Sequence, residues 1–234
     1  MPMSISLLGR ILDLIAPRSC AVCGCRLSPD EQAICIRCNL HLPRTHYEKV
    51  PYDNEMARLF WKRIPIEKCA AWFFFQAGSE AANILYRLKY HHHPETAEAI
   101  GLMIGQEWKE TGFFENIDLL IPVPLAHKRE RQRGYNQSME ITKGIHQATG
   151  IPIGKNIILR NRFVESQTHI GRWERADNVE GVFELIDAAT IHGKHVLLID
   201  DVVTTGATIT ACGQELAKAG DVRISVLSIG FAKE

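Results

Sequence analysis

The stretch that most constrains this chain is VLLIDDVVTTGAT, at residues 196–208. Residues 196–199 form a continuous apolar run, which is typical of a strand buried on both faces, as parallel strands are in α/β proteins. Asp200 and Asp201 come next, and an apolar-periodic segment at 209–219, closed by Gly220, is expected to be a helix. We therefore expect an α/β domain with two acids at the carboxyl end of a buried strand, where such sheets bind ligands.

The turn between the acids and that helix is rich in small and hydroxylated residues, namely Thr204, Thr205, Gly206, Ala207 and Thr208. At a helix amino terminus, free backbone N–H groups and the helix dipole favour a phosphate, and a glycine lets the backbone come close. The two acids can accept hydrogen bonds from vicinal hydroxyls or hold a hydrated Mg²⁺. The combination predicts a pocket for a phosphorylated sugar. The alternative is a structural strand that ends in an Asx-type turn.

Five of the seven cysteines lie together in the sequences CAVCGC and CIRC. They include two CxxC pairs, whose spacing lets both thiolates of a pair reach one tetrahedral Zn²⁺. The expected ligands are Cys20, Cys23, Cys35 and Cys38. Cys25 can replace Cys23, and His41 or His46 can replace another ligand. Disulfides and a thioredoxin-like redox pair are the alternatives to zinc, whereas Cys69 and Cys212 are expected to be buried apolar residues.

The composition sets broad limits on class and location. With 234 residues, 46% of them hydrophobic, the chain can form one large domain and a small module. Lys plus Arg and Asp plus Glu both number 27, so any basic site must be local. The first residues show a helical apolar stripe rather than a signal sequence, and no stretch is long enough to span a bilayer. We therefore expect a cytoplasmic protein.

The expected elements alternate, which favours a parallel sheet with right-handed crossovers. Loss of apolar periodicity at 42–52 places a boundary between a module at residues 1–50 and a domain at 51–234. Strands are expected at 70–76, at 117–122, near 157–158, at 196–199 and from 222 onward. Helices are expected around 56–61, from Ser79 to 89–93, at 95–111, within 134–150 and at 209–219.

Two further segments carry many arginines. Lys128, Arg129, Arg131 and Arg133 are offset only by Glu130. Such a cluster can neutralise a diphosphate, since Arg makes bidentate contacts that Lys cannot make, and the alternative is a solvated basic turn. Residues 161–182 are polar and without periodicity, which predicts a long functional loop.

Three motifs resemble those of the ComF family of phosphoribosyltransferase-like proteins. They are PVPLAHKRERQRGYNQS at 122–138, RNRFVESQTHIGRWERADNVEGVF at 160–183, and the two cysteine pairs. Residues 196–208 also resemble the phosphoribosyl-diphosphate (PRPP) loop of type I phosphoribosyltransferases. The resemblance implies an α/β type I phosphoribosyltransferase fold joined to a small N-terminal zinc-binding segment.

The resemblance also implies roles for particular residues. The ribose hydroxyls and 5-phosphate of PRPP would be bound by Asp200, Asp201, Val202, Val203, Thr204, Thr205, Gly206, Ala207 and Thr208. The pyrophosphate would be bound by Pro122, Val123, Pro124, Leu125, Arg129 and Arg133. Asp200, Asp201 and Arg172 would be catalytic, with Mg²⁺ bound together with PRPP. The family pattern is further matched by Arg162, Gln167, Thr168, Arg175 and Asn178, and by Lys89 and Tyr90, whose role stays open.

Three functions remain open at this point. The first is Mg²⁺-dependent transfer of a phosphoribosyl group to an unidentified base, with His169 and Glu165 as candidate general bases. The second, suggested by the family's association with natural transformation, is binding of single-stranded DNA, with Trp173 and Tyr135 as stacking rings. The third is an assembly factor with protein partners, among which the resemblance implies a competence helicase and recombination mediator proteins.

Overall fold

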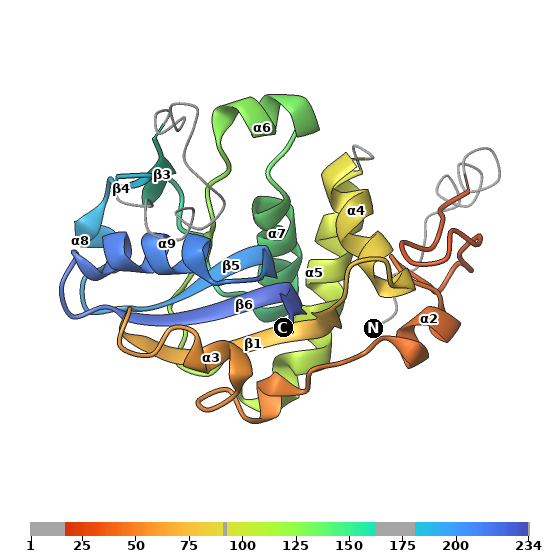
Figure 1. The fold of residues 1–234 in the computed structure, drawn as a ribbon, viewed down its shortest axis with the longest axis horizontal. Helices are drawn as coiled ribbons and strands as arrows, with labels where there is room; N and C mark the ends of the chain where they lie inside the picture. Colours follow the sequence, from red (N-terminus) through yellow and green to blue (C-terminus); the bar gives the residue numbers. More distant parts are fainter. Residues whose placement is uncertain (1–16, 91–92, 162–180, 234) are drawn as a thin grey trace, which may run out of the picture.

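A computed structural model of the chain describes residues 17–90, 93–161 and 181–233. Their central feature is a parallel four-stranded sheet in the order β1–β6–β5–β2 (Figure 1). The strands are β1 (Ile66–Phe75), β2 (Leu119–Pro122), β5 (His195–Val203) and β6 (Arg223–Ala232). They are buried along most of their length, which explains why their sequences are apolar runs rather than alternating patterns.

Helices flank the sheet (Figure 1). The α-helices are α2 (Ile36–His41), α3 (Glu55–Arg58), α4 (Asn83–Tyr90), α5 (Pro94–Trp108), α6 (His127–Arg133), α7 (Gln137–Thr149), α8 (Ala188–Ile191) and α9 (Ala207–Ala217). Short 3-10 helices are η1 (Tyr47–Lys49), η2 (Glu80–Ala82) and η3 (Lys109–Thr111). Helices α5 and α7 pack backbone to backbone, because a Cβ at Gly101 would lie 2.1 Å from the carbonyl oxygen of Ile141. The predicted α/β class, a parallel sheet flanked by helices, is confirmed.

The predicted helix boundaries agree with local capping. Ser79 accepts a hydrogen bond from the N–H of Ala82, so it caps η2, which leads directly into α4. Gly150 ends α7 with φ 76°, and its N–H donates to the carbonyl of His146. Strand β1 begins at Ile66, earlier than predicted. The prediction began at residue 70 because the charged Lys68 interrupts the apolar pattern expected of a buried strand. Lys68 is buried, and its ammonium donates to backbone carbonyls.

The short strand expected near residues 157–158 is present as β3 (Ile158–Arg160), but it does not join the parallel sheet, since it pairs antiparallel with β4 (Phe183–Leu185) in a separate hairpin. The alternative of a basic turn at 128–133 is excluded, because these residues lie on helix α6, which ends at Gly134 with φ 78°. Six long, straight-chain residues in a row, with no breaker before Gly134, favour a helix there.

The N-terminal segment is tied to the rest of the described chain by specific contacts. Asn83 Nδ2 donates to the carbonyl of Val22 at 2.9 Å, and Arg87 Nη1 donates to Ser19 Oγ at 2.7 Å. The N–H of Phe74 in β1 donates to the carbonyl of Pro43. The boundary near residue 50 stays a prediction. Within the described ranges, no helix combines the length and the apolar character needed to cross a bilayer.

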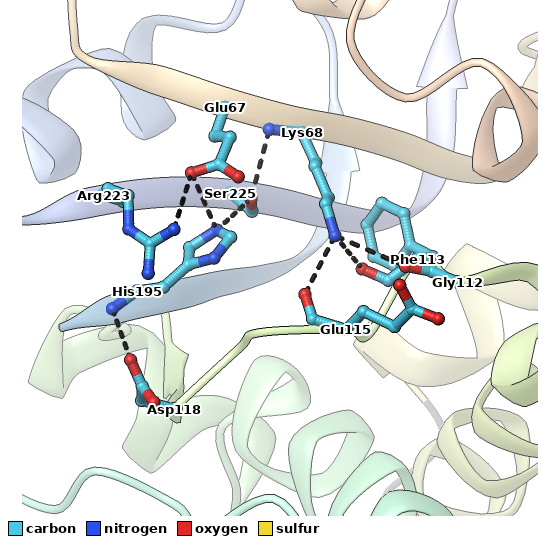
Figure 2. Close-up of polar contacts among 9 residues, drawn as sticks. All are labelled: Glu67, Lys68, Gly112, Phe113, Glu115, Asp118, His195, Arg223 and Ser225. Atoms are coloured by element: carbon cyan, nitrogen blue, oxygen red, sulfur yellow. Dashed lines mark hydrogen bonds and ion pairs between the residues drawn. The ribbon is translucent and has the colours of Figure 1, made fainter.

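The amino ends of the strands carry a polar cluster (Figure 2). Lys68 Nζ donates to the carbonyls of Gly112, Phe113 and Glu115 at 3.3, 3.2 and 2.9 Å. The buried His195 places its Nε2 2.8 Å from Ser225 Oγ, which also accepts from the N–H of Lys68. These contacts join β1, β5 and β6 to the segment that follows α5.

Candidate functional site

The predicted acid pair lies in the last part of β5, which continues past the acids to Val203. Asp200 is half-buried and Asp201 is buried. Asp200 Oδ1 accepts two hydrogen bonds, from Ser138 Oγ at 3.1 Å and from the N–H of Asp201 at 2.9 Å. Ser138 stands in the first turn of α7, so this helix fixes the orientation of the Asp200 carboxyl group.

The environment of Asp200 changes its protonation. Burial, and after it the neighbouring charge of Asp201, raises the pKa of Asp200 to about 7, although the hydrogen bonds from Asp201 N–H and Ser138 act in the opposite direction. A carboxyl group with such a pKa exchanges its proton near neutral pH. Strongly shifted acids of this kind are concentrated at functional sites.

Asp201 has a cationic neighbour whose role the sequence did not reveal. Lys89 Nζ, at the end of α4, lies 3.4 Å from Asp201 Oδ2. The only sequence signal for Lys89 was its match to a family motif, because nothing in the spacing joins residue 89 to residue 201. The fold brings the carboxyl end of α4 to the carboxyl end of β5.

The predicted turn after the acids precedes a helix, as expected. Thr204 and Thr205 are exposed, Gly206 is the N-cap of α9 with φ 76°, and the helix begins at Ala207. Gly206 has no side chain to satisfy the first N–H groups of α9, which are the groups that attract an anion. A Cβ at this position would also lie 2.8 Å from Cε1 of Phe60. The remaining members of the predicted set, Val202, Val203 and Thr208, are buried or half-buried beside the turn.

The predicted pyrophosphate segment begins at the end of β2, next to the acids. Pro122 pairs with Ile199, the residue immediately before Asp200. The N–H of Val123 donates to the carbonyl of Ile199 at 2.9 Å, and Asn136 Nδ2 donates to the carbonyl of Val123 at 3.1 Å. Pro124 and Leu125, both half-buried, lead from there into α6.

Several cations border this edge of the sheet. Lys128, Arg129 and Arg131 are exposed on α6, whereas Arg133 donates through Nη1 to Gln137 Oε1 at 2.7 Å. Sequence reasoning did not single out Arg160, which ends β3 and lies over the ring of Phe183, 5.3 Å from its centroid. Burial, and then the charge of Arg129, lowers the pKa of Arg160, while the charge of Asp200 raises it. Arg160 therefore interacts electrostatically with both the acid pair and α6.

The other predicted residues either lie outside the described residues or have a structural role. Arg172, the third predicted catalytic residue, lies outside the described residues, as do Arg162, Glu165, Gln167, Thr168, His169, Trp173, Arg175 and Asn178. Tyr135 is a packing residue rather than a stacking platform, because it is buried and its hydroxyl donates to the carbonyl of Leu88 at 2.6 Å.

The cysteine pairs converge as predicted. The four Sγ atoms of Cys20, Cys23, Cys35 and Cys38 all lie within 4.8 Å of one another and could hold a metal ion. Cys23 and Cys35 Sγ are 3.9 Å apart, close to the edge of about 3.8 Å expected for a tetrahedron with 2.3 Å Zn–S bonds. The N–H of Cys35 donates to Cys20 Sγ at 3.3 Å, a contact that favours a thiolate. Cys69 and Cys212 are buried elsewhere in the core, as predicted.

A cavity of about 720 Å³ lies between the N-terminal segment and α5. Its lining includes Pro17, Arg18, Arg87, Glu95 and Leu102, and it shares no lining residue with the acid pair, the Gly206 turn or the cysteine cluster. Its charges are mixed, so it does not favour one class of ligand.

Comparison with known proteins finds a DNA utilization protein and two competence proteins that are similar to this chain. The chain is 25% identical over 210 residues to the DNA utilization protein YhgH of Escherichia coli K12, covering 88% of this chain and 87% of that protein. It is 32% identical over 116 residues to Competence protein F of Haemophilus influenzae (49% of this chain, 51% of that protein). It is 33% identical over 107 residues to Competence protein ComFC of Bacillus subtilis (44% and 41%). No protein-family model matches the chain.

Solved structures similar to this chain include phosphoribosyltransferases. The allosteric regulatory enzyme of purine biosynthesis is 21% identical with a TM-score of 0.37, covering 58% of this chain and 25% of that enzyme. Adenine phosphoribosyltransferase from Saccharomyces cerevisiae is 15% identical with a TM-score of 0.36, covering 59% and 72%. The sequence matches confirm the resemblance that the motifs indicated: the chain is similar to the DNA utilization protein YhgH over most of its length and to the two competence proteins over about half of it.

Proposed function

We propose that this chain binds PRPP or a related phosphoribosyl ligand, together with Mg²⁺, and serves the uptake of single-stranded DNA during natural transformation. The observation that carries the proposal is a convergence at one sheet edge. The end of β2 is far in sequence from the acids of β5 and the Gly206 turn, yet β2 and β5 are adjacent strands that end together. In α/β proteins this is the edge at which ligands bind.

Each part of the edge suits one part of PRPP. Asp200 and Asp201 would accept hydrogen bonds from the ribose hydroxyls, and the first N–H groups of α9 would bind the 5-phosphate. Residues 122–125, Arg129, Arg133 and Arg160 would face the pyrophosphate, where Mg²⁺ supplies further charge neutralisation when bound. If the chain is an active phosphoribosyltransferase, the bond from the anomeric carbon to pyrophosphate breaks and a bond to the acceptor forms at this edge. Arg172 would then contribute from the 161–182 segment.

Calorimetry with PRPP and Mg²⁺ tests the ligand proposal directly. We expect saturable binding to the wild-type chain and a loss of at least about tenfold in affinity for Asp200→Asn, because the amide cannot accept as a carboxylate does. Asp187→Asn is a matched control, since Asp187 caps α8 outside the acid pair. Absence of PRPP and ribose 5-phosphate binding by the folded wild-type protein would refute the proposal.

A second candidate, direct binding of single-stranded DNA, is favoured by the exposed cations of α6. A protein that neutralises phosphates releases counterions, so its affinity falls linearly with salt on a logarithmic scale. For a labelled oligonucleotide we expect such a fall, and a shallower slope in the double variant Arg129→Gln/Arg131→Gln. An affinity that does not change with salt, or that is the same in the double variant as in the wild type, would exclude α6 as the DNA-binding surface.

The four-cysteine cluster supports a structural zinc ion as part of the same proposal. The fit of four thiol sulfurs to a tetrahedral edge favours Zn²⁺ over harder cations. Metal analysis of the purified protein should give one zinc per chain, which Cys35→Ser should lose. Cys25→Ser is the matched control, because Cys25 is an exposed thiol that lies beside Cys23 and Cys35 but is not one of the four cysteines whose sulfurs converge. Retention of zinc by Cys35→Ser, or its loss from Cys25→Ser, would contradict this ligand set.

The cytoplasmic location and the protein partners belong to this proposal as well. A competence helicase and recombination mediator proteins are the partners that the family resemblance implies. Helix α2, next to the cysteine cluster, exposes Ile36 and Leu40, which are 69% and 76% exposed. Purified candidate partners should bind the wild-type chain and bind the double variant Ile36→Ser/Leu40→Ser more weakly if this helix contributes to the contact.

A further inference from the structure

The two acids of the site differ in how the protein compensates their charge. Asp201 faces a cation, because Lys89 Nζ lies 3.4 Å from its Oδ2. The side chains of Lys89 and Asp201 are only 23% and 12% exposed. A sheltered pair of this kind is screened by salt much less than a pair on the open surface. Asp200, in contrast, meets neutral donors at its Oδ1, from Ser138 and from the N–H of Asp201.

Lys89 is held in place by the contacts of the residues before it. Leu88 is fully buried, and its carbonyl accepts the hydroxyl hydrogen of Tyr135 at 2.6 Å. Arg87 donates to Ser19 in the N-terminal segment at 2.7 Å. The last turn of α4 is therefore fixed from two sides, so the side chain of Lys89 starts from a fixed backbone position beside Asp201.

Two adjacent carboxylates repel each other, and a nearby positive charge offsets that repulsion. A divalent cation can supply that charge, but an ammonium group at 3.4 Å supplies it from the protein itself. The Oδ1 of Asp201 and the Oδ2 of Asp200 are the carboxylate oxygens not engaged by these contacts. They suit the two hydroxyls of a vicinal diol.

We infer that Lys89 is a positioning residue whose ammonium group holds the Asp201 carboxylate in place as an acceptor for a ribose hydroxyl and offsets its charge, so that the acid pair binds ribose 5-phosphate without a divalent cation. Mg²⁺ is then required only by the diphosphate of PRPP. The inference rests on the proposed function, because it assumes that the acid pair receives a ribose. It adds that the protein supplies the counterion of Asp201, which is Lys89, and that Mg²⁺ acts on the diphosphate rather than on the ribose.

The test measures ribose 5-phosphate binding by calorimetry, in buffer freed of Mg²⁺ by resin rather than by a chelator, so that any zinc stays bound. For the wild-type chain we expect the dissociation constant to change by less than about twofold on addition of Mg²⁺. Lys89→Met should weaken binding about tenfold without Mg²⁺ and recover about threefold or more with it, because the metal replaces the lost charge. Lys89→Arg should restore metal-independent binding. Lys218→Met, which removes a lysine from the opposite end of α9, should behave as wild type.

The outcomes separate the two proposals. A wild-type affinity for ribose 5-phosphate that rises about tenfold or more with Mg²⁺ overturns the role of Lys89 but leaves the phosphoribosyl site standing. Metal-independent binding by Lys89→Met equal to that of wild type also overturns it. No binding of ribose 5-phosphate or PRPP to the wild-type chain removes both proposals. The Mg²⁺ titration of the wild-type protein decides the matter even if Lys89→Met does not fold.

Discussion

The two ends of the parallel sheet carry similar side chains and use them differently. At the amino end, a lysine, a glutamate, a histidine and a serine meet in the cluster drawn in Figure 2. At the carboxyl end, Lys89, Ser138 and two aspartates meet beside an exposed threonine turn. Residue type alone therefore does not distinguish a structural cluster from a binding site.

The difference lies in where the polar atoms find partners. At the amino end, the Lys68 ammonium is shared among three backbone carbonyls, and Glu67 lies within 3.7–3.8 Å of Arg223 and His195. Most polar atoms of the cluster find partners within it, and the exception is the buried Nδ1 of His195, which has no hydrogen-bond partner among the described residues. At the carboxyl end, the N-cap of α9 is a glycine with no side chain to accept a hydrogen bond, and the N–H of Ala207 makes a long hydrogen bond of 3.4 Å to Thr205 Oγ1. A parallel sheet places helix amino termini at this end, so it is where a ligand can supply the missing acceptors.

The largest effect is expected at the amino end, and on stability. Lys68→Met should lower the free energy of unfolding by roughly 2–4 kcal/mol, because three carbonyls lose a charged donor in a buried position. Denaturant unfolding measures this loss, and calorimetry should show PRPP affinity unchanged. Lys218→Met, at an exposed helix end, is the control and should change stability by less than about 0.5 kcal/mol. A loss of ligand affinity without a loss of stability would contradict the structural role of this cluster.

The converse effect is expected at the carboxyl end. Asp201→Asn should weaken PRPP binding about thirtyfold, or about 2 kcal/mol, because a charged acceptor becomes a neutral amide. The free energy of unfolding should fall by less than about 1 kcal/mol, because the amide that replaces the carboxylate can still accept a hydrogen bond from the Lys89 ammonium group. Parallel unfolding and binding measurements check the pair of expectations. If stability falls more than affinity, the acids serve the fold rather than a ligand.

An intermediate effect, on both stability and binding, is expected in the Gly206 turn. Gly206→Ala should cost about 1–2 kcal/mol of stability, because φ is 76° and the new Cβ would lie 2.8 Å from Phe60. It should also weaken binding of ribose 5-phosphate. Gly150→Ala is a matched control with the same φ of 76° and no atom within 4 Å of its Cβ. Equal losses of affinity in the two variants would show that the Gly206 turn has no special part in binding.

The smallest effect is a pH dependence at the amino end. Burial lowers the pKa of His195, although the Glu67 charge acts in the opposite direction and Arg223 and Lys68 add to the lowering. The unfolded chain therefore binds a proton more readily than the folded one, and stability should fall as the pH drops below about 6.5. His195→Gln should flatten this slope in unfolding measurements between about pH 5 and pH 7. The exposed His192→Gln should leave the slope as it is, and an unchanged slope in His195→Gln would contradict the assignment.

Much of the site could be predicted because its signals are local in sequence. The apolar run, the paired acids and the glycine turn at 196–208 are contiguous, so strand, turn and helix follow from neighbouring residues. The cysteine spacing is equally local, and the four predicted thiols do converge. The sheet order and the pairing of β3 with β4 were not readable, because strand partners are chosen by packing over long separations.

The sequence by itself determined the α/β class, the acid pair, the Gly206 turn and the cysteine cluster. Only the tertiary structure decided that Lys89 and Ser138 contact the acids, that Arg160 is close enough to interact electrostatically with Asp200, and that Tyr135 packs against α4. It also decided that Lys68, a charge within an apolar strand, belongs to the sheet. The physical reason is that a charge or hydroxyl can be placed in many environments, and its partner is fixed only when distant segments pack together.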